Sequence, residues 1–378
     1  MKKIFSGSFE HFKKIWRVET NLPASFTVKY SFDVFNPLNH DLIKYCNNNR
    51  CLMIIDKNVH KIYFATIKKY FKTLKIELRI CIIDSNESNK NWRNADQIFK
   101  FLEKEKTLRR ETIVAVGGGV LLDIVGFCSS IYRRGIPYFK IPTTLLSIVD
   151  VSVGAKVAIN HFERRNRLGS YYPAVAALID KKFIKTQNKR EIINGIAEIF
   201  KLAIIKSSEL FSLLEKNYSQ LINEKFQFGA VPMRVINLAI SNMIEELAPN
   251  LWEKKLDRCV DFGHTFSPII EMKNIKNLLH GEAVALDCLF SSCIAYNRKY
   301  IDKKKLERIF KTAKDLGLPT FNKDFCNKKL LMKAIDDSIK HRNNNQYLPL
   351  PIDVGNYTII NNLSEKEITE AIKTFKKQ

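Results

Sequence analysis

The chain has 378 residues, enough for two domains with sizeable cores, and its 46% hydrophobic content is ordinary for a soluble globular protein. No stretch approaches the ~18 uncharged apolar residues that span a bilayer, and no apolar segment follows Lys2 and Lys3, so neither a membrane span nor a secretory signal is expected. The net charge of +23 suits a nucleic-acid binder, but the lysines are scattered and no nucleic-acid-binding motif accompanies them, so nucleic acid is not an expected partner. The eight cysteines form no C-x-x-C pair, which argues against a zinc ribbon and favours a reduced, cytoplasmic protein.

Short β-rich runs alternate with helical patterns in the first half of the chain. Residues 51–56, 78–84 and 112–116 have the composition of buried strands, and polar or glycine-containing turns follow them. From about residue 185 onward, apolar periodicity predicts helices at 191–214, 231–247, 267–272, 281–300 and 304–316. We therefore predict an α/β Rossmann-like nucleotide-binding domain at 1–185 and an all-α domain at 186–378, with the active site in a cleft between them.

A glycine-rich turn, Gly117-Gly118-Gly119, follows the third predicted strand and opens a helix. Glycine lets the backbone approach a pyrophosphate, and a helix N-terminus offers N–H donors and positive potential. The turn lacks the G-x-G-x-x-G spacing, so a tight structural turn is equally compatible with it. Asp56 ends the first predicted strand, where an acid can bind ribose hydroxyls or close an ordinary turn.

Three residues of the second half have the types of a metal site. Glu198 lies three residues before Lys201 in an apolar helical segment, and a buried carboxylate needs a partner such as a metal. His264 precedes one predicted helix, and His280, sixteen residues on, stands directly before another. Two histidines and a glutamate leave a coordination position open, which is typical of catalytic zinc. Spacing alone leaves ordinary structural roles for both histidines open.

Together these segments resemble the sugar phosphate cyclases, the family that includes 3-dehydroquinate synthase. The resemblance covers roughly residues 50–357, and its motifs occur in the family's order. They are Gly117-Gly118-Gly119-Val120 with Asp123, Tyr132-Arg133-Arg134-Gly135, Pro142-Thr143-Thr144-Leu145-Leu146, Asp150 to Lys156, Gly195-Ile196-Ala197-Glu198 with Lys201, Gly263-His264-Thr265-Phe266, and His280-Gly281-Glu282.

The resemblance implies cofactors, ligands and an assembly. A divalent metal, usually zinc with cobalt possible, would bind Glu198, His264 and His280. The sugar phosphate would contact Arg134, Lys156, Asn166 and Lys201, and the enzyme would be a homodimer. NAD would be bound by a larger set: Asp56, Asn58, Glu87, Lys90, Gly118, Gly119, Asp123, Thr143, Thr144, Asp150 and Arg165. The implied reaction combines transient oxidation by NAD, phosphate elimination, re-reduction and intramolecular aldol closure.

Four departures from the 3-dehydroquinate synthase pattern bear on the substrate. Met243 and Asp257 stand where those enzymes carry Lys and Arg, Asp261 replaces an asparagine, and Pro268 replaces a second histidine. A substrate carboxylate would lose its partners there and meet like charge, whereas a neutral hydroxymethyl group would find acceptors.

These four residues resemble the cyclases that act on sedoheptulose 7-phosphate, which has no carboxylate, and most of all the 2-epi-5-epi-valiolone synthases. Desmethyl-4-deoxygadusol synthase shares that substrate and is the near alternative. 3-Dehydroquinate synthase itself and a metal-dependent polyol dehydrogenase of similar fold are the further alternatives.

Overall fold

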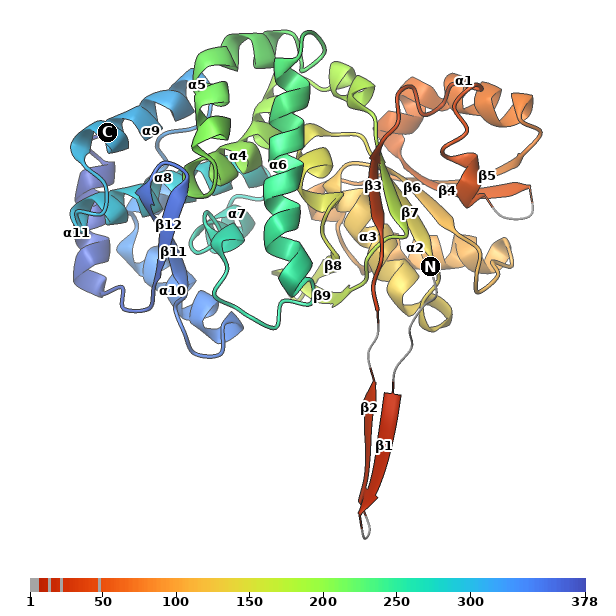
Figure 1. Ribbon diagram of the computed structural model, residues 1–378, viewed down its shortest axis with the longest axis horizontal. Helices are drawn as coiled ribbons and strands as arrows, with labels where there is room; N and C mark the ends of the chain where they lie inside the picture. Colours follow the sequence, from red (N-terminus) through yellow and green to blue (C-terminus); the bar gives the residue numbers. More distant parts are fainter. Residues whose placement is uncertain (1–6, 13–14, 21–22, 47–48) are drawn as a thin grey trace.

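The computed structural model describes residues 7–12, 15–20, 23–46 and 49–378. Its first half contains a six-stranded parallel sheet in the order β3-β10-β7-β6-β4-β5 (Figure 1). The predicted strands are β4, β5 and β6 of this sheet. The strand bounds are β3 Thr27–Tyr30, β4 Arg50–Asp56, β5 Glu77–Ile83, β6 Ile113–Gly117, β7 Tyr138–Pro142 and β10 Ala176–Ile179.

Helices cover both faces of this sheet, which explains why its central strands are continuous apolar runs. Successive residues of a strand point to opposite faces. In β4, Ile54 accordingly packs in the core under α2 (Trp92–Lys104) and α3 (Gly119–Ile131). Met53 and Ile55 instead pack in the core under α1 (Lys57–Thr73).

The strand order changes direction beside β4. The chain runs from β4 outward to β5 and then returns to place β6 on the other side of β4. In open parallel sheets, ligands bind at the carboxyl ends of the strands at such a switch point. Asp56 ends β4 and Gly117 ends β6, so both motifs of the predicted dinucleotide site lie there.

The second half of the chain is helical, as predicted, and also carries the antiparallel hairpin β11–β12 (Leu348–Asp353, Asn356–Ile360). The predicted helix at 191–214 is two helices, because Ser207 caps a new one by accepting from Leu210 N. No described helix is long and apolar enough to cross a membrane. The helices are α4 Lys189–Ile205, α5 Ser208–Asn223, α6 Val231–Leu247, α7 Ser267–Lys273, α8 His280–Asn297, α9 Lys303–Asp315, α10 Lys328–His341 and α11 Glu365–Phe375.

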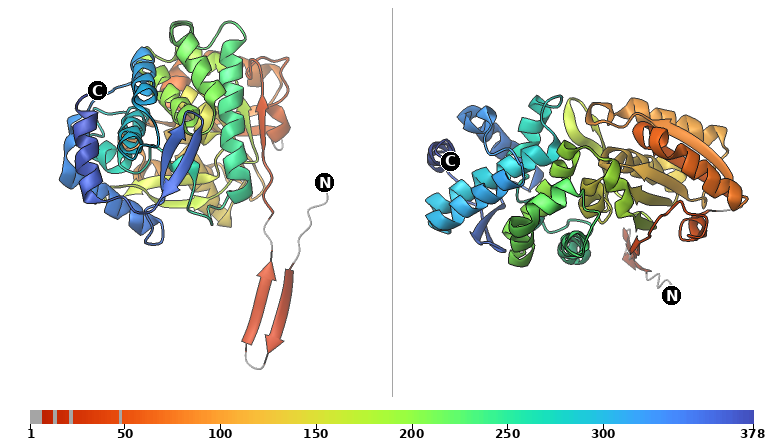
Figure 2. Two further views of the ribbon diagram at one scale, coloured as in Figure 1. Left: turned by 60° about the vertical axis from the view of Figure 1, so that its left-hand side comes forward. Right: turned by 90° about the horizontal axis from the view of Figure 1, so that it is seen from above.

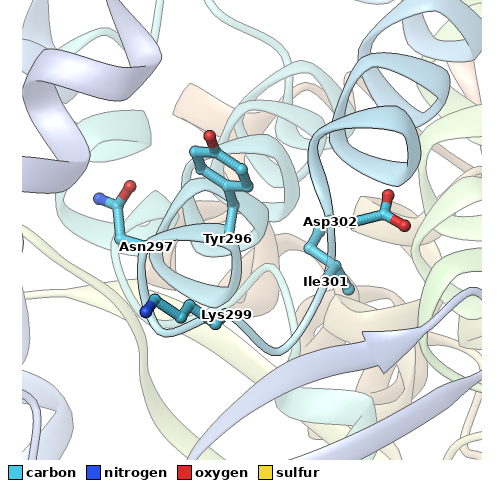
Figure 3. A pocket seen from close by; sticks show the side chains of 5 residues that line it. All are labelled: Tyr296, Asn297, Lys299, Ile301 and Asp302. Carbon is cyan, nitrogen blue, oxygen red and sulfur yellow. The ribbon is translucent and has the colours of Figure 1, made fainter.

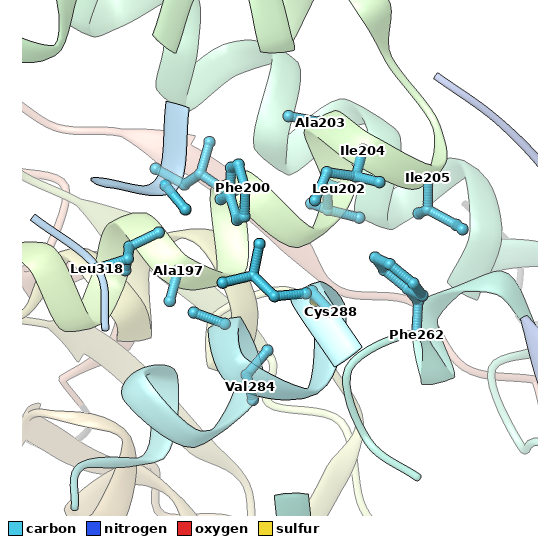
Figure 4. Close-up of a cluster of buried hydrophobic side chains, with 14 of the residues drawn as sticks. Ala197, Phe200, Leu202, Ala203, Ile204, Ile205, Phe262, Val284, Cys288 and Leu318 are labelled. Carbon is cyan, nitrogen blue, oxygen red and sulfur yellow. The ribbon is translucent and has the colours of Figure 1, made fainter. Parts of the chain in front are cut away.

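Helices α4 and α8 pack together at the centre of the helical half. Every residue of α4 from Ile192 to Ile205 is buried, and α8 is buried along nearly its whole length. Figure 4 shows the apolar cluster where Phe200 and Ala197 of α4 meet Val284 and Cys288 of α8. Glu198 therefore sits on a rigid, apolar support.

Two further hairpins form separate two-stranded sheets outside the main sheet. The hairpin β8–β9 (Lys156–His161, Arg164–Tyr171) packs against α3 and reaches α7 of the helical half. The hairpin β1–β2 (Gly7–Phe12, Ile15–Thr20) projects away from the rest of the molecule (Figures 1 and 2). The predicted domain boundary at residue 185 falls in the 3-10 helix Lys181–Thr186, between β10 and α4, and stays a prediction.

Candidate active site

Glu198, His264 and His280 converge, with one ligand atom of each lying within 4.8 Å of the others. Nε2 of His280 is 3.1 Å from Glu198 Oε1, and Nε2 of His264 is 3.7 Å from the same oxygen. Glu198 is fully buried, and neither of its oxygens has a hydrogen bond of good geometry among the described residues, although Lys201 Nζ lies 2.6 Å from Oε2. Lys201 pairs with Oε2, whereas the buried Oε1 has no hydrogen bond and faces both imidazoles, which fits a divalent cation as its partner.

The orientation of both imidazoles also fits a metal. His264 Nδ1 lies 3.1 Å from the carbonyl oxygen of Phe262, which can only accept, so Nδ1 carries the proton. His280 Nδ1 lies 3.0 Å from Glu271 Oε2, which can only accept, and 2.9 Å from Arg165 Nη1, which can only donate. A proton on Nδ1 satisfies the carboxylate and matches the tautomer of His264. Each ring turns its Nε2 toward Glu198, which is the orientation that a shared metal ion requires.

Glu271 of α7 is a residue that the sequence analysis missed. It is 2% exposed, and it contacts both His280 and Arg165. Burial opposes its charge, but Arg165 and His280 hold the pKa of Glu271 at about 2. A carboxylate behind a ligating histidine is a common outer partner of a metal site.

Two further buried groups hold the loops that carry the histidines. Asp287 of α8 accepts hydrogen bonds from the backbone N–H groups of Phe266 and Ser267, at 2.6 and 2.8 Å. Asn194 of α4 accepts from Gly281 N at 2.7 Å, which fixes the start of α8 beside His280. The sequence does not predict these roles, because an isolated Asp or Asn within a helix is usually a solvent-exposed residue.

The charges around the cluster are coupled. Burial raises the pKa of Asp150, and the nearby Glu198 raises it further. Burial acts in the opposite sense on Lys201, but Glu198 and Asp150 outweigh it and raise its pKa. The structure thus brings Asp150 and Lys201 to the metal cluster. Asp150 belongs to the π-helix Ser147–Val151, and such helical irregularities occur often at functional sites.

Six of the predicted dinucleotide residues, Asp56, Asn58, Gly118, Gly119, Thr143 and Thr144, follow or end the strands β4, β6 and β7 at their carboxyl ends. Gly118 caps α3, and a Cβ there would lie 3.2 Å from Thr144 Cγ2, so a side chain would crowd this turn. Thr143 N bonds Gly117 O, while a Cβ on Gly119 would lie 3.1 Å from Val151. The helix therefore begins with free N–H groups and bare backbone, as a pyrophosphate requires.

Asp56 and Asn58 stand at the neighbouring strand end. Asp56 Oδ1 caps α1 by accepting from Asn58 N and Val59 N, and Oδ2 accepts from Ser85 Oγ at 2.6 Å. The carboxylate of Asp56 thus stabilises the local turn and the start of α1. The sequence analysis gave such a structural role as the alternative to binding ribose hydroxyls. The side chain of Asn58 is exposed.

A polar chain joins the remaining predicted cofactor residues to Asn166. Lys90 is 2% exposed, and its Nζ bonds Asp123 Oδ2 at 2.5 Å and Asn166 Oδ1 at 2.6 Å. Arg165 lies 3.9 Å from Glu87 and also contacts Glu271, so it links this chain to the metal cluster.

The predicted substrate-side residues are paired with groups that the sequence analysis did not single out. Lys156 Nζ lies 2.9 Å from Glu253 Oε1. Asp261 is held by Arg258 at 2.7 Å and by Arg342 at 3.2 Å, and these cations lower its pKa against the effect of burial. Arg258 also contacts Glu253. Asp261 is thus committed to two arginines, whereas we expected it to offer free acceptors.

The other predicted substrate residues are less closely tied to the cluster. Met243 of α6 is 3% exposed in the helical core, and Pro268 lies in the first turn of α7. Asp257 and Arg134 are exposed, and neither contacts a charged or hydrogen-bonding partner among the described residues.

A surface pocket lined by Tyr296, Asn297, Lys299, Ile301 and Asp302 lies at the opposite end of α8 from His280 and contains no predicted residue (Figure 3).

Comparison with known proteins places this geometry in a family. Residues 80–194 match the N-terminal family model of 3-dehydroquinate synthase, and residues 195–340 match the C-terminal one. The chain belongs to the 3-dehydroquinate synthase family. The predicted fold class and the resemblance to this family are both confirmed.

Individual relatives within the family are similar over nearly the whole chain. A 2-epi-5-epi-valiolone synthase of Streptomyces albus is 37% identical over 94% of this chain and 89% of its own length. A demethyl-4-deoxygadusol synthase of Trichormus variabilis is 32% identical over 99% of this chain and 93% of its own length. The solved structure of the 2-epi-5-epi-valiolone synthase ValA from Streptomyces hygroscopicus subsp. jinggangensis 5008, with NAD+ and Zn2+ bound, superposes with a TM-score of 0.92 at 37% identity, covering 96% of this chain and 99% of that one.

Proposed function

We propose that this protein is a sugar phosphate cyclase that converts sedoheptulose 7-phosphate to 2-epi-5-epi-valiolone with release of phosphate. The observation that carries the proposal is the Glu198, His264 and His280 cluster lying beside a dinucleotide-type switch point, in a chain 37% identical to 2-epi-5-epi-valiolone synthases. NAD would supply a reversible hydride acceptor, and Zn2+ or Co2+ would polarise substrate oxygens.

The charge balance beside the cluster supports a substrate without a carboxylate. Asp261 pairs with Arg258 and Arg342, and Glu253 pairs with Arg258 and Lys156. Met243 adds no charge at its buried position. A substrate carboxylate would have to displace an existing ion pair, whereas a neutral hydroxymethyl group would leave the pairs intact.

The remaining proposed roles belong to side chains of this chain. Lys201, which Glu198 and Asp150 keep protonated, would stabilise negative charge that develops on the substrate. Lys156 and Asn166 would orient the phosphate, with Arg134 as a further phosphate ligand. Asp56, Asn58, Glu87, Lys90, Gly118, Gly119, Asp123, Thr143, Thr144, Asp150 and Arg165 would bind NAD.

Incubation of the purified protein with sedoheptulose 7-phosphate, Zn2+ and a trace of NAD tests the proposal. We expect phosphate release in large excess over NAD and no net NADH, because the hydride returns to the substrate in each cycle. A polyol dehydrogenase would instead accumulate NADH. Phosphate release from the carboxylate-bearing substrate of 3-dehydroquinate synthases alone would favour that activity.

Demethyl-4-deoxygadusol synthase remains the second candidate, because a relative of that name is 32% identical over 99% of the chain. Both candidate enzymes would act on sedoheptulose 7-phosphate, so the identity of the product distinguishes them.

We also propose a cytoplasmic homodimer. All eight cysteines lie in the described part of the chain and none is in a disulfide, as in a reducing compartment. The β1–β2 hairpin pairs only with itself among the described strands, and an isolated two-stranded hairpin is marginally stable in water. A second copy of the chain would give this hairpin a packing partner. Light scattering on the purified protein should give twice the chain mass, whereas a monomer would contradict the proposal.

A further inference from the structure

Asn160, near the end of β8, bonds three residues that the proposed function places in the site. Its side-chain Nδ2 donates to Glu87 Oε1 at 2.8 Å. Its Oδ1 accepts from the backbone N of Asn166 at 2.8 Å, and its own backbone N donates to Lys90 O at 2.7 Å. One residue therefore touches two proposed NAD ligands and one proposed phosphate ligand.

The partners determine which way the amide points. The Glu87 carboxylate can only accept a hydrogen bond, and the Asn166 N–H can only donate one. The Asn160 amide must therefore turn its nitrogen to Glu87 and its oxygen to Asn166. Aspartate offers no donor in place of the nitrogen, and alanine offers neither group.

Asn166 is held in one backbone conformation. Its φ of +49° lies in the left-handed region, which asparagine adopts more readily than most other residues. The bond from its N–H to Asn160 and the bond from Lys90 Nζ to its Oδ1, at 2.6 Å, hold it from two sides. Glu87 in turn lies on the short 3-10 helix Glu87–Asn89, 3.9 Å from Arg165.

We propose that Asn160 is a positioning residue that holds the NAD-binding side of the site, through Glu87 and Lys90, in register with the phosphate-binding side, through Asn166. The assignment of these two sides rests on the proposed function. Asn160 acts through its neighbours and itself needs no contact with either ligand.

Two substitutions separate the two hydrogen bonds. Asn160→Asp keeps the acceptor for Asn166 but removes the donor to Glu87 and places a like charge beside it. We expect the Kd for NAD to rise about 10-fold while the KM for sedoheptulose 7-phosphate stays within about 2-fold of wild type. Asn160→Ala loses both bonds, and we expect both constants to rise. The Kd is measured by calorimetry on protein stripped of NAD.

Asn39→Ala is the matched control. Asn39 lies outside the proposed site and also uses both ends of its amide, donating to Ser31 and Phe32 and accepting from Asp41 N. A thermal melt of each variant compares the stability lost, and Asn39→Ala should leave NAD binding unchanged.

The NAD titration decides the proposal without any turnover. Unchanged NAD affinity in Asn160→Asp, or an equal loss in Asn39→Ala, would overturn it. If no heptulose phosphate is turned over but Asn160→Asp alone loses NAD affinity, the proposed function fails and the positioning role stands.

Discussion

At the scale of single residues, Glu271 determines how His280 presents itself to a metal. Its carboxylate accepts from Nδ1, so Nε2 stays free to coordinate. Glu271→Gln keeps the shape but weakens this bond and removes the nearest counter-charge of Arg165, which lies beside the ring. We expect the affinity for Zn2+ to fall about 10- to 100-fold, as metal titration with a chelator would show.

Glu215→Gln serves as the control for this variant. Glu215 pairs with Arg308 at the surface, at 2.7 Å, so its loss should leave metal affinity unchanged. Equal affinity of wild type and Glu271→Gln would show that Glu271 does not support the metal ligand.

Asp257 is the residue at which the substrate preference can be tested with least damage to the fold. It is exposed, whereas Met243→Lys would insert a charge at a position 3% exposed in the core. Asp257→Arg adds a cation that Glu253 and Asp261, already paired, do not neutralise. We expect a several-fold lower kcat/KM on sedoheptulose 7-phosphate with an unchanged melting temperature. Identical kinetics would show that Asp257 does not act on the substrate.

At the scale of elements, the contact between α4 and α8 places Glu198 opposite His280. A Cβ on Gly281 would lie 2.0 Å from the carbonyl oxygen of Asn194, so Gly281→Ala must push the two helices apart. We expect a loss of about 1–3 kcal/mol in the free energy of unfolding, measured with urea, together with weaker Zn2+ binding. Gly154→Ala, whose Cβ would meet nothing closer than 3.9 Å, is the control for stability. A Gly281→Ala protein as stable as wild type would contradict this packing.

Lys140 of β7 holds the segment between the π-helix and β8. It is 1% exposed and donates to the carbonyl oxygens of Val151 and Gly154, at 2.8 and 3.0 Å. Burial lowers its pKa to about 8, although Asp123 and Asp150 act in the opposite direction, and the Tyr138 ring lies 5.7 Å away. Above this pKa the folded protein has lost a proton that the unfolded chain keeps up to about pH 10.5.

This shift makes Lys140 a source of pH-dependent stability. Because the unfolded state binds more protons between pH 8 and 10.5, the contribution of Lys140 to stability rises with pH across that window, by at most about 3 kcal/mol. The free energy of unfolding is measured with urea at each pH for wild type and for Lys140→Met. The difference between the two free energies should isolate this rise. A difference that is flat across the window would mean that Lys140 titrates normally.

At the scale of the whole molecule, the sequence predicted those strands and site residues that a strong apolar pattern or a family motif marks. The strands β4, β5 and β6 belong to a sheet with helices on both faces, so their apolar runs stand out. The metal cluster was predictable because Glu198, His264 and His280 carry the family's motifs. The strand β9 was missed because arginine and other exposed polar residues fill most of Arg164–Tyr171.

The pairing of charges could not be predicted from the sequence. Arg258 is only three residues from Asp261, but Arg342 comes from a distant segment, and only the fold brings it to Asp261. Glu271 was missed for the same reason, because its partners Arg165 and His280 lie on β9 and at the start of α8. Residues that act through a neighbour carry no local pattern, so only the folded structure identifies them.

The most direct test of the account is the structure of the product, determined by NMR and mass spectrometry after incubation with sedoheptulose 7-phosphate, NAD and Zn2+. We predict 2-epi-5-epi-valiolone, one phosphate released per cyclitol formed, and no net NADH. Demethyl-4-deoxygadusol would keep the cyclase and its substrate but correct the product. Formation of 3-dehydroquinate from the carboxylate-bearing substrate, with no product from sedoheptulose 7-phosphate, would contradict the roles assigned to Met243, Asp257, Asp261 and Pro268.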